Sequence, residues 1–271
     1  KAERSVHIID NKIISRETAP AFLLLTILLC VFFVLDILLG SVTLKPSEIF
    51  SAFSGNSTSE VDTIIFRFRL PKAITAVFVG IALSLSGLQM QTVFRNPMAG
   101  PYVLGVSSGA SLGVAIVILG FSTSFMPANL NILGNWVLVI SAWIGAAAVM
   151  LLVMSLSARI KDILVILIIG IMIASGLSAV VSIMQYFSSE TMLKSYVLWT
   201  MGSLGNLSAD QLKVLVISVT SGVILSLFSM KMLNALLLGE SYAASIGLNI
   251  KFARFLIFTC TSIRAGSVTS F

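Results

Sequence analysis

Long segments without any charged residue constrain this chain more than any other feature of its sequence. The longest lies between Arg95 and Arg159. Shorter ones occupy 18–35, 73–94, 163–189 and 214–230. A transmembrane helix needs about 20 mostly apolar residues, so the longest segment holds two spans and each of the others holds one. The chain is therefore predicted to be an all-α polytopic membrane protein.

Composition supports this class. The 271 residues include only 17 basic and 11 acidic ones, and 57% are apolar. The mean hydropathy of +1.05 is far above that of a soluble domain, in which roughly a quarter of residues are charged. Disordered chains, secreted disulfide scaffolds and ordinary cytosolic enzymes are excluded.

The charge gaps predict seven membrane spans and a simple domain organisation. The spans are 20–40, 71–92, 102–120, 135–157, 163–187, 210–230 and 252–271. Polar connections at 41–70 and 188–209 lie on the outer side. Loops on the N-terminal side carry more Lys and Arg, which places the N-terminus in the cytoplasm. Residues 1–19 then form a cytoplasmic segment, 20–271 the transmembrane domain, and 231–251 a cytoplasmic loop.

Few side chains in the sequence are suited to metal or nucleotide chemistry. Cys30 and Cys260 lie in apolar segments, which is typical of core residues. The single histidine, His7, cannot build a multi-His metal site. The phosphate-binding pattern G-x-x-x-x-G-K-[ST] does not occur. We expect no metal and no cofactor bound directly, and any ATP and Mg²⁺ to lie on a separate ATPase. The net charge of +6 indicates loops that face anionic lipid rather than nucleic acid.

Small residues form a stripe along the third predicted span. Gly105, Gly109 and Gly113 recur every four residues and share one helical face. Such stripes let helices approach closely in lipid. The stripe predicts tight helix packing, which is compatible with a second interpretation, that small residues permit sliding or line a wide path.

Two cytoplasmic segments could take part in gating or in binding a partner. Two prolines and a glycine in the run from Arg95 to Pro101 prevent helix continuation. This run is a tight turn or, alternatively, a constriction at the inner end of a pathway. In the loop 231–251, residues from Glu240 to Ile246 are predicted as a short helix that stops at Gly247. That helix could dock a soluble partner or simply connect two spans.

Two charged residues fall within the predicted spans. Asp36 lies near the outer end of the first span, and Arg264 lies midway along the last apolar run without an explanation from the sequence. The spans contain no chain of Asp, Glu and His residues, such as many ion-coupled carriers use. This favours energy supplied by another protein.

Four ordered motifs resemble one family. They are Arg69-Leu70-Pro71-Lys72, the run from Arg95-Asn96-Pro97-Met98 to Leu104-Gly105-Val106-Ser107-Ser108-Gly109, then Met201-Gly202-Ser203-Leu204, and finally Leu238-Gly239-Glu240 to Gly247. Together they resemble the FecCD-type permeases, the membrane subunits of type II ABC importers for iron–siderophores, haem and cobalamin.

The resemblance implies an assembly in the bacterial inner membrane. A permease of ten spans like that of the cobalamin importer would pair with a second copy in the lipid bilayer, as a homodimer. Two ATPase subunits would bind on the cytoplasmic side and an extracytoplasmic substrate-binding protein on the other. About seven of the ten spans are present, so the chain is expected to be incomplete at its C-terminus. Arg264 replaces an apolar residue usual in the family.

The resemblance also implies residue roles. Arg69 and Lys72 would receive acidic residues of the binding protein. Asn96, Pro97 and Met98 would form one inner gate. The segment Asp162, Ile163 and Leu164 would form the other, without the polar Ser and Thr residues of the family. The ATPase would receive a coupling helix with Gly239, Glu240, Ala243, Ala244 and Gly247.

The sequence leaves two alternatives open. One is an ion-coupled secondary carrier or channel, and the other is a nonfunctional permease fragment. The motifs do not distinguish among siderophores, haem and cobalamin as cargo.

Overall fold

The computed structural model describes the backbone of residues 2–120, 130–157, 159–160, 162–205 and 207–271, and the side chains of these ranges apart from 2–17 and 130–135. In the predicted N-terminal segment, residues 2–17 have only their backbone described, and Lys1 lies outside the described residues. The chain divides into two compact units, Lys1–Ile74 and Thr75–Phe271. Each unit is considered by itself.

The first unit is built from α1 and a short helical region that follows it. Its elements are α1 (Ala2–Leu38), α2 (Pro46–Phe53), α3 (Ser59–Asp62), the π-helix η1 (Thr63–Arg69) and the first turn of α4 (Leu70–Phe94). Ile37, Ile49 and Ile65 are buried together, and Phe53 packs edge-on against Phe66. The connection predicted at 41–70 is thus largely helical, and η1 continues directly into α4.

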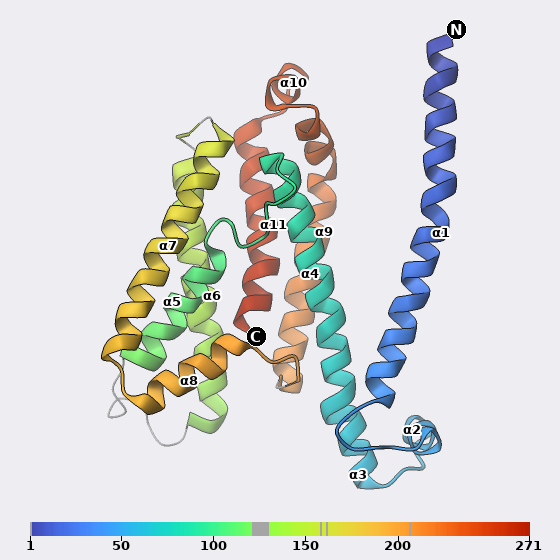
Figure 1. The fold of residues 1–271 in the computed structure, drawn as a ribbon, viewed down its shortest axis with the longest axis vertical. Coiled ribbons are helices and arrows are strands. Elements are labelled where there is room, and N and C mark those ends of the chain that lie inside the picture. Colours follow the sequence, from blue (N-terminus) through green and yellow to red (C-terminus); the bar gives the residue numbers. More distant parts are fainter. Residues whose placement is uncertain (1, 121–129, 158, 161, 206) are drawn as a thin grey trace. The chain divides into compact units, whose positions relative to one another are not determined.

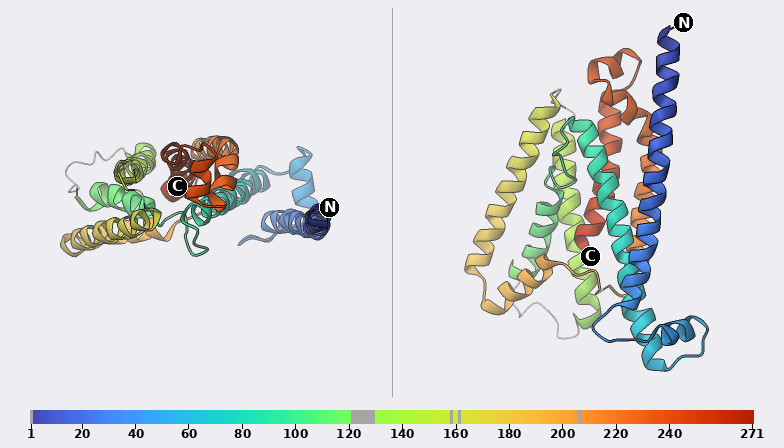
Figure 2. Two further views of the ribbon diagram at one scale, coloured as in Figure 1. Left: turned by 90° about the horizontal axis from the view of Figure 1, so that it is seen from above. Right: turned by 45° about the vertical axis from the view of Figure 1, so that its right-hand side comes forward.

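The second unit is a bundle of long helices with two short helices at its ends (Figure 1). After α4 come α5 (Val106–Ala115), the π-helix η2 (Ile116–Gly120), α6 (Leu130–Ser157), α7 (Ile163–Phe187), α8 (Glu190–Met201), α9 (Ala209–Leu237), α10 (Glu240–Ser245) and α11 (Ile250–Ser270). Helix α6 packs against both α5 and α11, and α11 also packs against α9 (Figure 2). We call the two ends of this unit the α10 end and the α8 end.

Five described helices are long and apolar enough to cross a membrane. They cover Thr18–Leu38, Ser59–Phe94, Trp136–Ser157, Ile163–Phe187 and Ala209–Leu237. The predicted all-α membrane class is confirmed. The span predicted at 102–120 is a shorter apolar helix, Val106–Gly120, because the preceding prolines and Gly105, with φ +76°, delay the start of α5.

Helix α11 occupies the position of the seventh predicted span. It is 21 residues long but is not among the five, since it carries Lys251, Arg254 and Arg264. These charges lower its hydropathy relative to the other long helices.

The small-residue stripe on α5 lies directly against α6. A methyl group built on Gly109 would lie 2.6 Å from the backbone oxygen of Gly145, and one built on Gly113 would overlap the backbone oxygen of Ser141. Similarly, a methyl group on Gly170 of α7 would lie 2.7 Å from the oxygen of Val103. Helix α5 therefore approaches α6, and α7 approaches the α4–α5 connection, at a backbone-to-backbone distance that only glycine permits.

We expect Gly109→Ala to lower the melting temperature of the purified protein in lipid nanodiscs. The added methyl group has no room against α6, and overpacking of this kind costs about 1–3 kcal/mol. Gly176→Ala on α7 is the matched control, because a methyl group there meets no atom within 4 Å. Equal melting temperatures for the two variants would contradict the close packing of α5 on α6.

Candidate functional site

The α10 end of the second unit gathers the connections between its helices. The C-terminus of α4, the α6–α7 connection, α10 and the start of α11 all lie there (Figure 1). Helix α10 begins after Gly239, with φ +119°, and is followed by Gly247, with φ +89°. Both conformations favour glycine. The short helix predicted from the sequence is present, one residue shorter than expected.

A buried arginine joins α10 to the α6–α7 connection. Arg254 of α11 is 4% exposed. Its Nη2 donates to both carboxylate oxygens of Glu240, at 2.6 and 2.8 Å, and its Nη1 donates to the backbone oxygen of Ile160 at 3.1 Å. One guanidinium thus contacts the first residue of α10 and the segment that follows α6.

A second arginine joins the α4–α5 connection to the C-terminus of α9. Arg95 has φ +48° and directly follows α4. Its Nε and Nη2 donate to the backbone oxygen of Leu236 at 3.3 and 3.2 Å, and Nη2 also donates to that of Leu237 at 3.3 Å. A methyl group built on Gly239 would lie 2.7 Å from Nη2 of Arg95, so this contact also requires glycine at Gly239.

Three of the five predicted coupling residues, Glu240, Ala243 and Ala244, lie on α10, and the buried Gly239 and the exposed Gly247 flank it. Ala243 is fully buried, and Glu240 is turned toward Arg254. Ala244 and Gly247 are exposed, together with the apolar side chains of Tyr242 and Ile246. The outward surface therefore consists of Tyr242, Ala244, Ile246 and Gly247. Tyr242 and Ile246 are not among the five predicted coupling residues. Glu240 and Ala243 hold the helix in place.

The predicted inner-gate residues form turns and caps at the same end. The side-chain oxygen of Asn96 accepts from the backbone N–H of Met98 at 2.9 Å, and Met98 is 86% exposed. Asp162 caps α7 by accepting from the N–H of Leu164 at 2.8 Å. Pro97 and Leu164 are exposed and Ile163 is half-buried. Their gate role stays a prediction.

The predicted docking pair of the first unit has only one exposed member. Arg69 is 7% exposed, and its Nη1 donates to the backbone oxygens of Ile37 and Leu38 at 2.6 and 2.9 Å, while Nη2 donates to that of Val42. It caps the last turn of α1. Lys72 is exposed and forms an ion pair with Asp36 at 2.9 Å. Arg69 thus satisfies helix-end carbonyls, and the docking role of Arg69 and Lys72 stays a prediction.

Arg264, unexplained by the sequence, lies at the centre of a buried polar network. It is fully buried, and its Nε donates to Ser86 at 3.1 Å. Its Nη1 donates to the backbone oxygen of Gly222 at 3.0 Å and to Ser226, and its Nη2 donates to Gln89. These partners belong to α4 and α9, so the arginine joins three helices.

Gln89 extends this network. It donates to Ser229 at 3.1 Å and accepts from Thr261 at 3.0 Å. The described contacts of Arg264 are with neutral groups, which disperse its charge over several dipoles. A pattern in the sequence could have indicated this network, because Ser86 with Gln89 and Ser226 with Ser229 place polar residues three apart on apolar helices.

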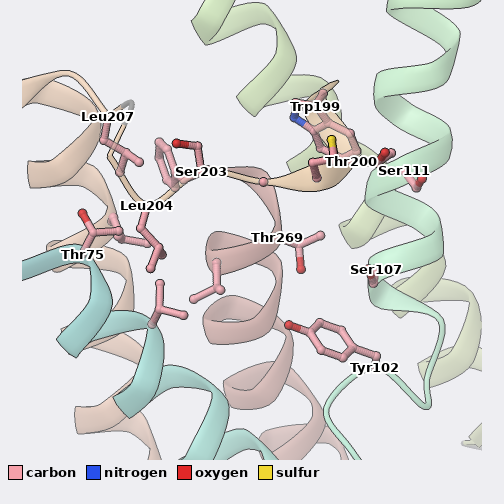
Figure 3. Close-up of a pocket in the computed structure, with 16 residues that line it drawn as sticks. Thr75, Tyr102, Ser107, Ser111, Trp199, Thr200, Ser203, Leu204, Leu207 and Thr269 are labelled. Atoms are coloured by element: carbon pink, nitrogen blue, oxygen red, sulfur yellow. The ribbon is translucent and has the colours of Figure 1, made fainter. Parts of the chain in front are cut away.

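A cavity of about 440 Å³ opens among α4, α5, α8, α9 and the end of α11. Figure 3 shows hydroxyl groups around it from several elements. The polar and aromatic lining includes Thr75, Tyr102, Ser107, Ser111, Trp199 and Thr269. The described lining residues carry no charge, so the cavity can accept hydrogen-bonding groups without forming an ion pair.

Comparison with known proteins identifies the class that this fold and site define. The model of the FecCD transport family matches residues 27–271. The chain belongs to the FecCD transport family. A solved structure of a metal-chelate type ABC transporter in an inward-facing conformation superimposes with a TM-score of 0.75 at 31% identity, covering 92% of this chain and 75% of that one.

Several curated permeases are similar in sequence. The hemin transport system permease HmuU of Yersinia pestis is 34% identical over 76% of this chain and 61% of its own length. The vitamin B12 import system permease BtuC of Citrobacter koseri is 30% identical over 89% and 69%. The molybdate import system permease MolB of Haemophilus influenzae is 32% identical over 86% and 68%. The chain spans about three fifths of the length of the first relatives it matches, 58% and 61%.

The Arg264 network predicts an unusual pair of stability effects. Gln89→Leu removes a buried acceptor of a cation and should destabilise the protein by about 1.5–3 kcal/mol. Adding Arg264→Met to that variant should restore part of the loss, because the unsatisfied charge disappears. Thermal unfolding of both variants in detergent checks this. A double variant less stable than Gln89→Leu alone would contradict the network.

Proposed function

We propose that this chain is the membrane-spanning permease of an ATP-driven importer that moves an iron–siderophore, haem or cobalamin-type chelate by alternating access. The proposal rests mainly on the contacts at the α10 end. There Arg254 joins the short, exposed helix α10 to the α6–α7 connection, and Arg95 joins the α4–α5 connection to the end of α9. The family match supports the same class. It favours an importer permease over an ion-coupled carrier or channel, because the relatives are described as permeases of transport or import systems.

The energy source in this proposal is a separate ATPase that holds ATP and Mg²⁺. The exposed surface of α10, with Tyr242, Ala244 and Ile246, is the contact proposed for it. A second copy of the permease completes the pathway, with two ATPase subunits on the cytoplasmic side of a bacterial inner membrane. The α10 end then faces the cytoplasm and the α8 end faces outward.

The neutral cavity supports a bulky cargo handed over by a binding protein. Hydroxyl and aromatic side chains can hydrogen-bond or pack against a chelate, while the lack of charge among the described lining residues avoids a tight ion pair. The relatives named above carry hemin, vitamin B12 and molybdate, so the choice among chelates depends on features outside the shared fold.

A basic surface on the first unit is the proposed contact for the binding protein. Arg67 and Lys72 are exposed near the junction of η1 and α4. Positive charge there would steer acidic residues of the partner and fix its orientation. Arg69 contributes indirectly, because it holds the end of α1 beside this surface.

The proposal is tested by uptake into proteoliposomes that contain the full-length permease and its ATPase. Ferric siderophore, haem, cobalamin and molybdate are offered in turn with the cognate binding protein. We expect ATP-dependent accumulation of one of the first three and none with a hydrolysis-deficient ATPase. Accumulation that needs no ATPase and follows an ion gradient would refute the proposal.

Charge reversal tests the docking surface. Arg67→Glu with Lys72→Glu should weaken binding of the substrate-binding protein, more at low salt than at high salt, because exposed charges are screened over about 10 Å at 0.1 M salt. Lys213→Glu, an exposed lysine on α9, is the control. Surface plasmon resonance measures the affinity. Unchanged binding by the double variant would remove this role.

A further inference from the structure

Two arginines link α10 and the end of α9 to the connections that contain the predicted inner-gate residues. Arg254 contacts Glu240 and the backbone of Ile160, and Arg95 contacts the end of α9 immediately before α10. We propose that Arg254 and Arg95 are the positioning residues through which a movement of α10 reaches the α6–α7 and α4–α5 connections. This inference rests on the proposed function, since it takes α10 as the contact for the ATPase.

The described contacts of Arg254 join three parts of the second unit. Its own backbone belongs to α11, its Nη2 binds the Glu240 carboxylate through both oxygens, and its Nη1 binds the Ile160 carbonyl. The side chain of Arg254 is 5% exposed and that of Glu240 is 34% exposed. A guanidinium donates in several fixed directions, whereas a lysine ammonium is a compact charge on a flexible stem. Lysine at this position can keep the ion pair with Glu240 without holding Ile160 in the same geometry.

Arg95 makes the corresponding connection on the other side of α10. Its backbone starts the turn that contains Asn96, Pro97 and Met98, and its guanidinium holds the last carbonyls of α9. These carbonyls belong to Leu236 and Leu237, so only Leu238 and Gly239 separate them from α10. A displacement of α10 therefore acts on this turn across a short connection.

The contact of Arg254 with Glu240 is stronger than the contact of Arg95 with the end of α9, so the two are expected to couple α10 to its neighbours to different degrees. The Arg254–Glu240 contact joins two charges, one of them buried, and such charge-assisted hydrogen bonds are about twice as strong as neutral ones. Arg95 binds neutral carbonyls at 3.2–3.3 Å and is exposed. The α6–α7 connection should follow α10 closely, and the α4–α5 turn should follow it more loosely.

The experiment compares Arg254→Lys with the wild-type chain in the complete complex with its ATPase and binding protein, reconstituted in proteoliposomes. ATPase binding, ATP hydrolysis and cargo uptake are measured on the same preparation. We expect ATPase binding and hydrolysis to remain, while uptake per ATP hydrolysed falls about tenfold, within the usual range of coupling between sites. Arg95→Lys should reduce the same ratio by a smaller factor.

Arg159→Lys is the matched control. It makes the same substitution at an exposed arginine of the α6–α7 connection, one residue before Ile160, and should keep the wild-type ratio. Where Arg254→Lys gives too little folded protein, Glu240→Gln carries the test, because it keeps the size of the side chain and weakens the same contact. A variant that keeps the wild-type melting temperature but shows less uptake per ATP hydrolysed has lost coupling rather than stability.

Two results would overturn the inference. One is a wild-type ratio of uptake to hydrolysis in both Arg254→Lys and Glu240→Gln. The other is loss of ATPase binding in step with uptake, which would make Arg254 part of the docking surface. A wild-type complex without any ATP-dependent uptake would instead refute the proposed function, so the two failures are distinguishable.

Discussion

Carbonyl groups at helix ends have few partners in a chain as apolar as this one, and arginine side chains supply them. Arg69 caps α1, Arg95 caps α9, and Arg254 binds the segment after α6. An unsatisfied backbone group costs most where water is absent, so these contacts determine how helix ends meet. Arg264 extends the same use of arginine into the interior, where it joins α4, α9 and α11.

The remaining architecture depends on close contact between helices. Apolar side chains give little attraction between helices in lipid, since the lipid itself is apolar. Backbone approach at Gly109 and Gly113 provides packing instead. Small residues thus hold the helices of the second unit together, while Arg95 and Arg254 act at one of its ends and Arg264 in its interior.

The spacing of charged residues and glycines along the sequence predicts much of this fold. It does not predict the contacts of the long arginine side chains. Charge gaps located most of the spans, and Gly247 marked the end of α10. The partners of Arg69 lie 27–32 residues away in the chain, those of Arg95 lie 141–142 away, and those of Arg264 lie 38–178 away. Spacing in the sequence cannot say which distant carbonyl a flexible arginine reaches. For this reason the sequence did not predict the helix-end contacts of Arg69 and left Arg264 without an explanation.

In the proposed coupling, α10 and the α6–α7 connection move together. Spin labels at Ile246 and Arg159, both exposed, test it by pulsed electron paramagnetic resonance on the assembled transporter after replacement of Cys30 and Cys260. We expect one distance distribution for this pair in the nucleotide-free and ATP-bound states, while labels at Ile246 in the two copies of the proposed dimer change their separation. A nucleotide-dependent distance between Ile246 and Arg159 would contradict it.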